Sequence, residues 1–153
     1  MSRPIIEDQP LVEPSAGPTR EFSFPFILPS DGLGGEYQYP ADTLNYRAWG
    51  GFRVPWDFTA WTSIEIVLWP IIAGASNLSV RYYAGACGEL YNTHALITNP
   101  ALVMALNQLL CFDALADGAA FWAALTPGDN VMLSVRNVGA SQARIPFGIV
   151  RYT

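Results

Sequence analysis

The sequence predicts an all-β fold, an antiparallel β-sandwich of the jelly-roll kind with about seven or eight strands and at most one short helix. Three observations predict it: short segments alternate apolar and polar residues, turn-forming residues separate them, and one stretch alone is rich in helix formers. A chain of 153 residues is long enough for one domain with a buried core. We divide it into an extended N-terminal arm, residues 1–21, and a sandwich domain, residues 22–153.

The arm contains four prolines within its first eighteen residues, at positions 4, 10, 14 and 18. Prolines at this spacing exclude a helix and favour extended or polyproline conformation. Aliphatic residues recur between them, namely Ile5, Ile6, Leu11 and Val12. Two interpretations remain open: a disordered tail, or an arm that lies along a neighbouring subunit and places these aliphatic side chains in its grooves.

The first strand is predicted at Glu21–Leu28, because its three phenylalanines alternate along one face. Pro25 would place that strand at a sheet edge. The glycine-rich segment Pro29–Gly35 and the segment Tyr37–Asn45 are predicted loops. A second strand is predicted at Tyr46–Val54, with a bulge at its two consecutive glycines.

The clearest pattern lies at the centre of the chain. In Thr62–Trp69, Ile64, Ile66 and Leu68 fall on one face, which predicts a strand with that face toward the core. Pro70 should end the strand, and Gly74–Asn77 has the composition of a turn. The chain then alternates again in Leu78–Tyr83, so the two segments are predicted to pair as an antiparallel hairpin.

The C-terminal half is less uniform. Ala86–His94 is a predicted loop, and Ala95–Ala114 fits either a buried strand or a helix, because its leucines also have helical spacing. Asp113–Leu125 favours a short helix. Two further strands are predicted, Asn130–Arg136 and Arg144–Tyr152, whose expected inward residues are Val131, Leu133 and Val135 in the first and Ile145, Phe147 and Ile149 in the second.

The composition points to association with other proteins. Hydrophobic residues make up 51% of the chain and charged residues only 14%, so we expect apolar surface patches and an obligate partner, most simply further copies of the chain. The net charge is −5, there is no lysine, and no basic run occurs, so we expect no nucleic-acid partner. We also expect no signal peptide, no membrane partner, and assembly in a cytoplasm.

No set of residues has the pattern of a catalytic or metal site. His94 is the single histidine, and its only nearby candidate ligands are Cys87 and Glu89. A nucleophilic Cys87–His94 pair and a zinc site are the two chemical alternatives, and the preferred interpretation is a loop histidine that hydrogen-bonds its neighbours. Cys87 and Cys111 are expected to be buried free thiols, with a single disulfide as the alternative. We therefore expect a protein that is not an enzyme and has no cofactor or metal.

The tryptophans suggest the main alternative function, which is carbohydrate binding. Four of the five lie within twenty-one residues, at Trp49, Trp56, Trp61 and Trp69. Exposed aromatic side chains on a sandwich can stack on sugars, which would make the chain a carbohydrate-binding module. The preferred interpretation is that these side chains fill the core and the subunit interfaces.

The segments F-R-V-P-W-D-F-T-A-W-T-S-I-E-I-V-L-W (52–69), R-Y-Y-A-G-A-C-G-E-L-Y-N-T-H (81–94) and L-T-P-G-D-N-V-M-L-S-V-R (125–136), with the ending I-V-R-Y-T (149–153), resemble capsid decoration (cement) proteins of tailed phages, especially thermophilic ones. The resemblance covers about residues 45–153 and is carried by structural motifs. The ambiguous 101–112 region departs from it, since a cleaner strand is expected there.

The resemblance implies a structural virion protein on the capsid exterior, made in the host cytoplasm. The alternative is a carbohydrate-binding sandwich module of a phage tail or fibre protein. It implies a sandwich that trimerises on the major capsid protein, with a terminal arm that clasps adjacent subunits. Partner contacts are then expected from the arm aliphatics Ile5, Ile6, Leu11 and Val12, and from the aromatics Trp49, Trp56 and Trp61.

Overall fold

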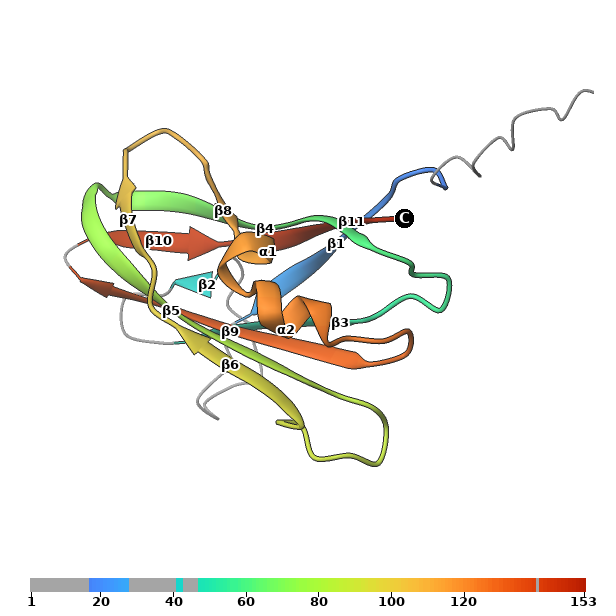
Figure 1. Ribbon diagram of the computed structural model, residues 1–153. Coiled ribbons are helices and arrows are strands. Elements are labelled where there is room, and N and C mark those ends of the chain that lie inside the picture. The colour runs from blue at the N-terminus through green and yellow to red at the C-terminus, as the bar shows by residue number, and fades with distance from the viewer. Residues whose placement is uncertain (1–16, 28–40, 43–46, 140) are drawn as a thin grey trace, which may run out of the picture.

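The structure is a computed structural model that describes residues 17–27, 41–42, 47–139 and 141–153. These residues form an antiparallel all-β fold with two short helices, which confirms the predicted fold class (Figure 1). The described elements are β1 (Arg20–Ile27), β2 (Ala41–Asp42), β3 (Ala48–Arg53), β4 (Trp61–Ile72), β5 (Gly74–Gly85), β6 (His94–Thr98), β7 (Ala101–Met104), β8 (Leu110–Asp113), α1 (Ala114–Asp117), α2 (Ala119–Ala123), β9 (Asn130–Gly139), β10 (Gln142–Ile145) and β11 (Phe147–Tyr152).

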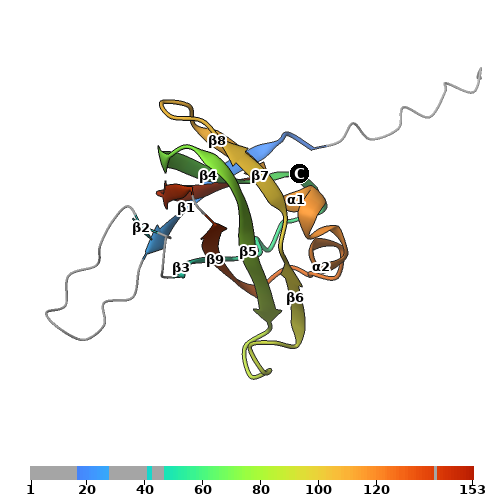
Figure 2. The same ribbon diagram turned by 90° about the vertical axis from the view of Figure 1, so that its left-hand side faces the viewer.

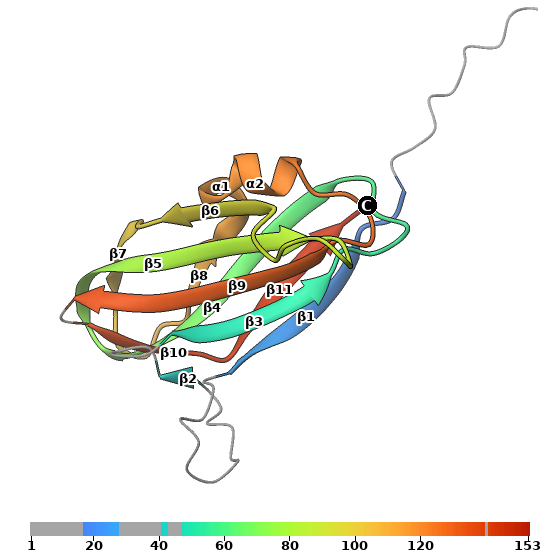
Figure 3. The same cartoon turned by 90° about the horizontal axis from the view of Figure 1, so that it is seen from below.

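The strands form one hydrogen-bonded path, β2-β10-β4-β11-β1-β3-β9-β5-β6, with β8 beside β4 and β7 beside β5. The path folds over on itself into two layers: in Figure 1, β4, β10 and β11 lie above β5, β9 and β6. Figure 3 looks onto β5, β9 and β3. We call β2, β10, β4, β11 and β8 the first sheet, and β3, β9, β5, β6 and β7 the second sheet. Four of the described strands, β2, β7, β8 and β10, have four residues or fewer, which explains why the sequence pattern predicted fewer strands.

Strand β1 joins the two sheets. Its residues up to Pro25 pair with β11, and Phe26 and Ile27 pair with β3. Each paired residue of β1 thus has a partner strand on one side only, and Pro25 lies where the strand changes partner, so the predicted edge position fits locally although β1 lies inside the strand path. Phe24 and Phe26 are buried and Phe22 packs against the core, as the alternation predicted.

The central prediction was right about the strands and wrong about their pairing. Ile64, Ile66 and Leu68 are fully buried, and so are the inward residues of β5. However, β4 pairs with β8, β10 and β11, whereas β5 pairs with β6, β7 and β9. The two strands face each other across the core instead of forming a hairpin.

The chain crosses from β4 to β5 through one residue, Ala73, followed by Gly74 at a positive φ of 142°. Strand β4 continues past Pro70, which lies opposite Ala143 where the β4–β10 register shifts. An irregular pairing accommodates the missing N–H of proline. The predicted strand end at Pro70 and the predicted turn at 74–77 are both wrong.

The structure also decides the predictions made for the two consecutive glycines, for the ambiguous stretch 95–114 and for the last strand. The register of β3 against β9 is continuous through Gly50 and Gly51, so no bulge occurs there; a side chain at either position would collide with the backbone of a neighbouring strand. The ambiguous stretch 95–114 forms the strands β6, β7 and β8. Pro146 divides the last predicted strand in two, so that in β11 the residues Gly148, Val150 and Tyr152 point inward in place of Phe147 and Ile149.

Two consecutive helices replace the single short helix that was predicted, and Gly118 separates them. The side chain of Asp113 caps α1 by accepting a hydrogen bond from the Ala116 amide. The helices lie against β4 and β6, where they cover the open side between the sheets (Figures 1 and 3). The predicted loop 29–35 and most of 37–45 lie outside the described residues.

Trp122 on α2 attaches the helices to the core. Its indole N–H donates to the Ala114 carbonyl at 2.7 Å, and its ring stacks on Phe52 at 6.2 Å and 8°. Tyr82 of β5 meets the same indole edge to face, and its hydroxyl donates to Asp117 at 2.6 Å. Thr98 donates to the same carboxylate oxygen at 2.5 Å. One aromatic cluster thus joins both sheets and both helices.

We expect Gly148→Ala to destabilise the fold by roughly 1–3 kcal/mol, because the added methyl would overlap the buried Phe24 ring. Gly17→Ala is the matched control, since its added methyl meets no atom within 4 Å. Urea unfolding of both variants measures the difference. Equal free energies of unfolding would contradict the close approach of Phe24 to β11.

Burial and the hydrogen bond to Asp117 raise the pKa of Tyr82 above its usual 10.0. The unfolded state therefore loses this proton first as the pH rises past about 10, and stability should fall there. We expect Tyr82→Phe to cost roughly 1–3 kcal/mol at pH 7, where the hydrogen bond is intact, and to make the alkaline fall shallower. Urea unfolding from pH 7 to 11 measures both effects. Tyr91→Phe, at a largely exposed position, should change neither; an unchanged alkaline slope in Tyr82→Phe would refute the argument.

Candidate binding surfaces

The predicted contact residues divide into two groups. Ile5, Ile6, Leu11 and Val12 lie outside the described residues. Trp49 is half-buried on the outer face of β3, and Trp56 is 72% exposed in the loop that follows, with the Arg53 guanidinium 4.9 Å from its ring centre. Trp61 instead packs on the core side of β3 and donates to the Trp122 carbonyl at 3.0 Å. Trp61 therefore does not share a face with Trp49.

Apolar side chains gather at the end of the sandwich where β4 crosses to β5. We call this surface the apolar end, and Figure 2 views the molecule from it. The registers of β7, β9 and β10 on β4 and β5 bring these strands together there. Its exposed large side chains are Trp69, Ile71, Ile72, Val103, Leu106, Leu109 and Val138. They are seven of the twelve exposed large hydrophobic residues in the described chain.

The apolar end has a shallow groove of about 400 Å³ over β5, lined by β7 on one side and the end of β9 on the other. Buried polar groups hold the backbone beneath it: Ser141 donates to Ser76 at 2.5 Å, and the Asn137 amide donates to the Ser141 carbonyl. The groove is therefore formed by fixed strands. An apolar surface on a fixed support has the features of a protein-binding site.

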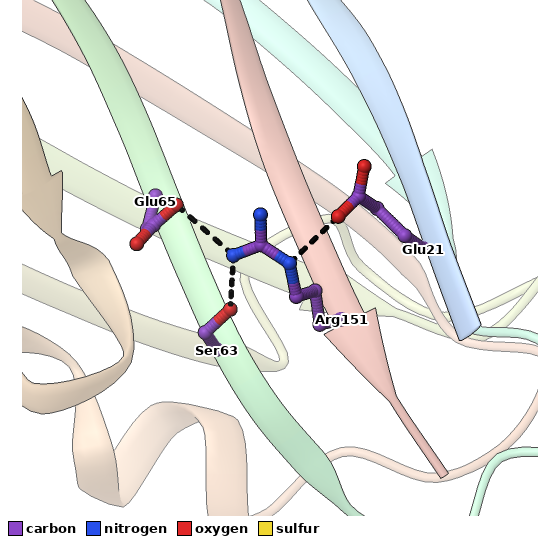
Figure 4. A network of polar contacts seen from close by, with 4 residues as sticks. All are labelled: Glu21, Ser63, Glu65 and Arg151. Atoms are coloured by element: carbon purple, nitrogen blue, oxygen red, sulfur yellow. Dashed lines mark hydrogen bonds and ion pairs between the residues drawn. The ribbon is translucent and has the colours of Figure 1, made fainter. Parts of the chain in front are cut away.

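On the outer face of the first sheet, an arginine forms ion pairs with carboxylates of the neighbouring strands. Arg151 on β11 donates to Glu21 on β1 at 2.6 Å and to Glu65 on β4 at 3.2 Å, and it also donates to Ser63 at 3.0 Å (Figure 4). The hydrogen bond to Glu21 raises the pKa of Arg151. This arginine has its counter-charges within the fold.

On the outer face of the second sheet, three arginines lie close to one another. Arg47, Arg81 and Arg136 gather there from β5, β9 and the residue before β3, and we call them the arginine cluster. No described carboxylate forms an ion pair with any of them, whereas Arg20 pairs with one carboxylate and Arg151 with two. Arg47 reaches across β9 and donates to Ser79 Oγ at 2.5 Å and to Ser134 Oγ at 3.3 Å.

The charges of the arginine cluster are close enough to affect one another. Burial lowers the pKa of Arg47, and the positive charges of Arg81 and Arg136 lower it further. The Nε of Arg81 is buried and has no hydrogen-bond acceptor among the described residues. Three guanidinium groups thus repel one another, and one donor is left unsatisfied.

A cleft of about 480 Å³ adjoins the arginine cluster. Gly51 and Met132 form part of its floor, and the loop between β5 and β6 forms its wall, which includes Glu89. Tyr83 and Tyr91 meet edge to face in it, with ring centres 5.5 Å apart. Tyr83 is two residues from Arg81 on the same face of β5, so the cleft and the cluster are about 7 Å apart along the strand.

The local candidates for metal or thiol chemistry gain no support in the described residues. No group of three or more metal-ligating side chains occurs in them. Cys87 and Cys111 are free thiols, and both are exposed, so the predicted burial of these thiols is wrong. Cys87 lies in the loop that lines the cleft, and Cys111 lies on the short strand β8. No helix in the described part of the chain is both long and apolar enough to cross a membrane.

Sequence reasoning missed the arginine cluster and the cleft. The three arginines are separated by 34 and 55 positions, so no local run indicates them. The available signal was the alternation of β5, which places Arg81 and Tyr83 on the face opposite Leu78, Val80 and Tyr82. That signal could identify the face, but the pairing with β9 and β3 was needed to identify the cluster.

The chain matches no family model, and no curated protein or solved structure is significantly similar to it.

Proposed function

We propose that this chain is a non-enzymatic structural protein of a virus particle, a decoration protein that binds the outer capsid surface as an oligomer. The observation that carries the proposal is the apolar end, which holds seven of the twelve exposed large hydrophobic side chains of the described residues, five of them on strands. The resemblance of residues 45–153 to decoration proteins of tailed phages supplies the identity of the assembly.

The apolar end fits this role energetically. Burying apolar surface contributes roughly 25 cal/mol per Å², and a standard interface buries about 800 Å² on each partner. Val103 and Val138 beside the groove, with Ile72 at the edge where the chain crosses between the sheets, can supply the centre of such an interface. We propose that copies of the chain associate there, most simply as a trimer.

Binding to an assembled lattice would stabilise it by linkage. A protein that binds the lattice and not the free capsid subunits shifts the equilibrium toward the lattice. Joining several contacts in one oligomer multiplies their effect, because the second and third contacts form at high effective concentration. In this proposal, the major capsid protein is the partner, and residues 1–16 with their aliphatic side chains add contacts beyond the sandwich.

We expect Val103→Asp to disrupt self-association without unfolding the monomer, because this side chain is 73% exposed and a carboxylate would resist burial in an interface. Leu90→Asp is the matched control: Leu90 is 75% exposed and lies in the β5–β6 loop, away from the apolar end. Sedimentation velocity of the full chain measures the oligomer. Loss of the oligomer in both variants, or in neither, would contradict the proposed interface.

The virion role is tested by quantitative mass spectrometry of purified virus particles, which gives the copy number of this chain relative to the major capsid protein. We expect hundreds of copies, near one for each capsid subunit. A handful of copies would place the chain in a tail or fibre, and its absence from particles would overturn the virion role.

A further inference from the structure

The arginine cluster and the cleft together present an arrangement that the assembly role does not use. Both lie on the outer face of the second sheet, and the groove of the apolar end lies further along the same face, where the pair Asn77 and Val138 is two residues beyond Ser79 and Arg136. From the geometry we infer that this face binds an acidic saccharide, a sugar residue that carries a carboxylate, as uronic and sialic acids do. The inference stands independently of the capsid role.

The arginine cluster fits the carboxylate. Guanidinium groups bind carboxylates through paired, charge-assisted hydrogen bonds. Arg136 is exposed and Arg81 is half-buried, so a carboxylate can approach both side chains from solvent. That carboxylate would also reduce the mutual repulsion of the three arginines, which have no described counter-ion. Bonds to Ser79 and Ser134 hold Arg47 in place before any ligand arrives.

The cleft fits the sugar ring. Tyr91 is 66% exposed and Tyr83 is half-buried, so the pair offers aromatic surface to an apolar ring face. Glu89 and Asn130 add polar groups that can bond hydroxyls. The Glu89 side chain is fixed by accepting a hydrogen bond from the Ala86 amide at 2.9 Å. A volume of about 480 Å³ lies in the range of small-ligand sites.

A single acidic sugar fits better than a polyanion. The chain has a net charge of −5, and Glu89 lines the cleft next to the cluster, so a nucleic acid or a run of acidic residues would meet repulsion. One carboxylate can contact the arginines while uncharged hydroxyls face Glu89. The tryptophans that first raised carbohydrate binding are not part of this site, except that Trp49 lies opposite Ser134 at its margin.

The experiment uses a glycan array and a matched pair of sugars on the full chain. The array should show binding to glycans that end in uronic or sialic acids and none to their neutral counterparts. Titration followed by NMR should then give D-glucuronate an affinity at least about tenfold above that of D-glucose, equivalent to ~1.4 kcal/mol, because the two differ only in the carboxylate.

Variants locate the site. We expect Arg81→Gln and Tyr91→Ala each to weaken glucuronate binding by about tenfold or more. Arg144→Gln is the charge-matched control, since Arg144 lies in the first sheet beside the Trp69 ring, and its affinity should stay within about twofold of wild type. Near-UV circular dichroism confirms that each variant is folded.

Three results would overturn the inference. They are equal binding of glucuronate and glucose, equal weakening by Arg144→Gln and Arg81→Gln, and binding of an acidic peptide with no acidic glycan bound. None of them bears on the copy number of the chain in virus particles, so the two proposals fail separately.

Discussion

Contact between the inner faces of β4 and β5 is the interaction on which the rest of the fold depends. Ile64, Ile66 and Leu68 on one strand and Leu78, Val80 and Tyr82 on the other are all fully buried. Because only Ala73 separates the strands, the two sheets are held face to face by adjacent parts of the chain. Every other strand adds to one side or the other of this pair.

A sandwich built this way has an open side, and the aromatic cluster closes it. Trp122 contacts Phe52 of the second sheet and Trp61 of the first, while its indole N–H satisfies a helix carbonyl. Gly118 allows this, since a side chain there would crowd both Trp122 and Tyr82. The helices can therefore be short, because packing rather than length holds them.

Alternation in the sequence identified the strands and most of the inward residues correctly, because a period of two follows directly from strand geometry. Pairing was not predictable in the same way. Both β4 and β5 have an apolar inner face, and such a face fits a hairpin or two opposed sheets equally well. Helical leucine spacing in 95–114 was also uninformative, since Leu106 and Leu109 are exposed outside any strand.

For the binding surfaces, too, the sequence indicated the kind of residue that is exposed but not where those residues come together. Composition alone indicated apolar surface, and the structure gathers much of it at one end. The arginine cluster depends on three strands that meet only in the folded chain, so no property of a single segment predicts it. The exposure of both cysteines was also unpredictable, because cysteine composition carries no information about which face of a strand or loop it occupies.

The pairing of β1 with β11 has a mechanical consequence. Arg20, the first residue of β1, lies opposite Tyr152, and the apolar end lies at the far end of β4, so a pull on residue 20 against a body anchored at the apolar end acts along the strand axis. Antiparallel hydrogen bonds run perpendicular to the strands. Such a load shears the β1–β11 bonds all together instead of opening them one at a time, which is the stronger of the two geometries for a protein under tension.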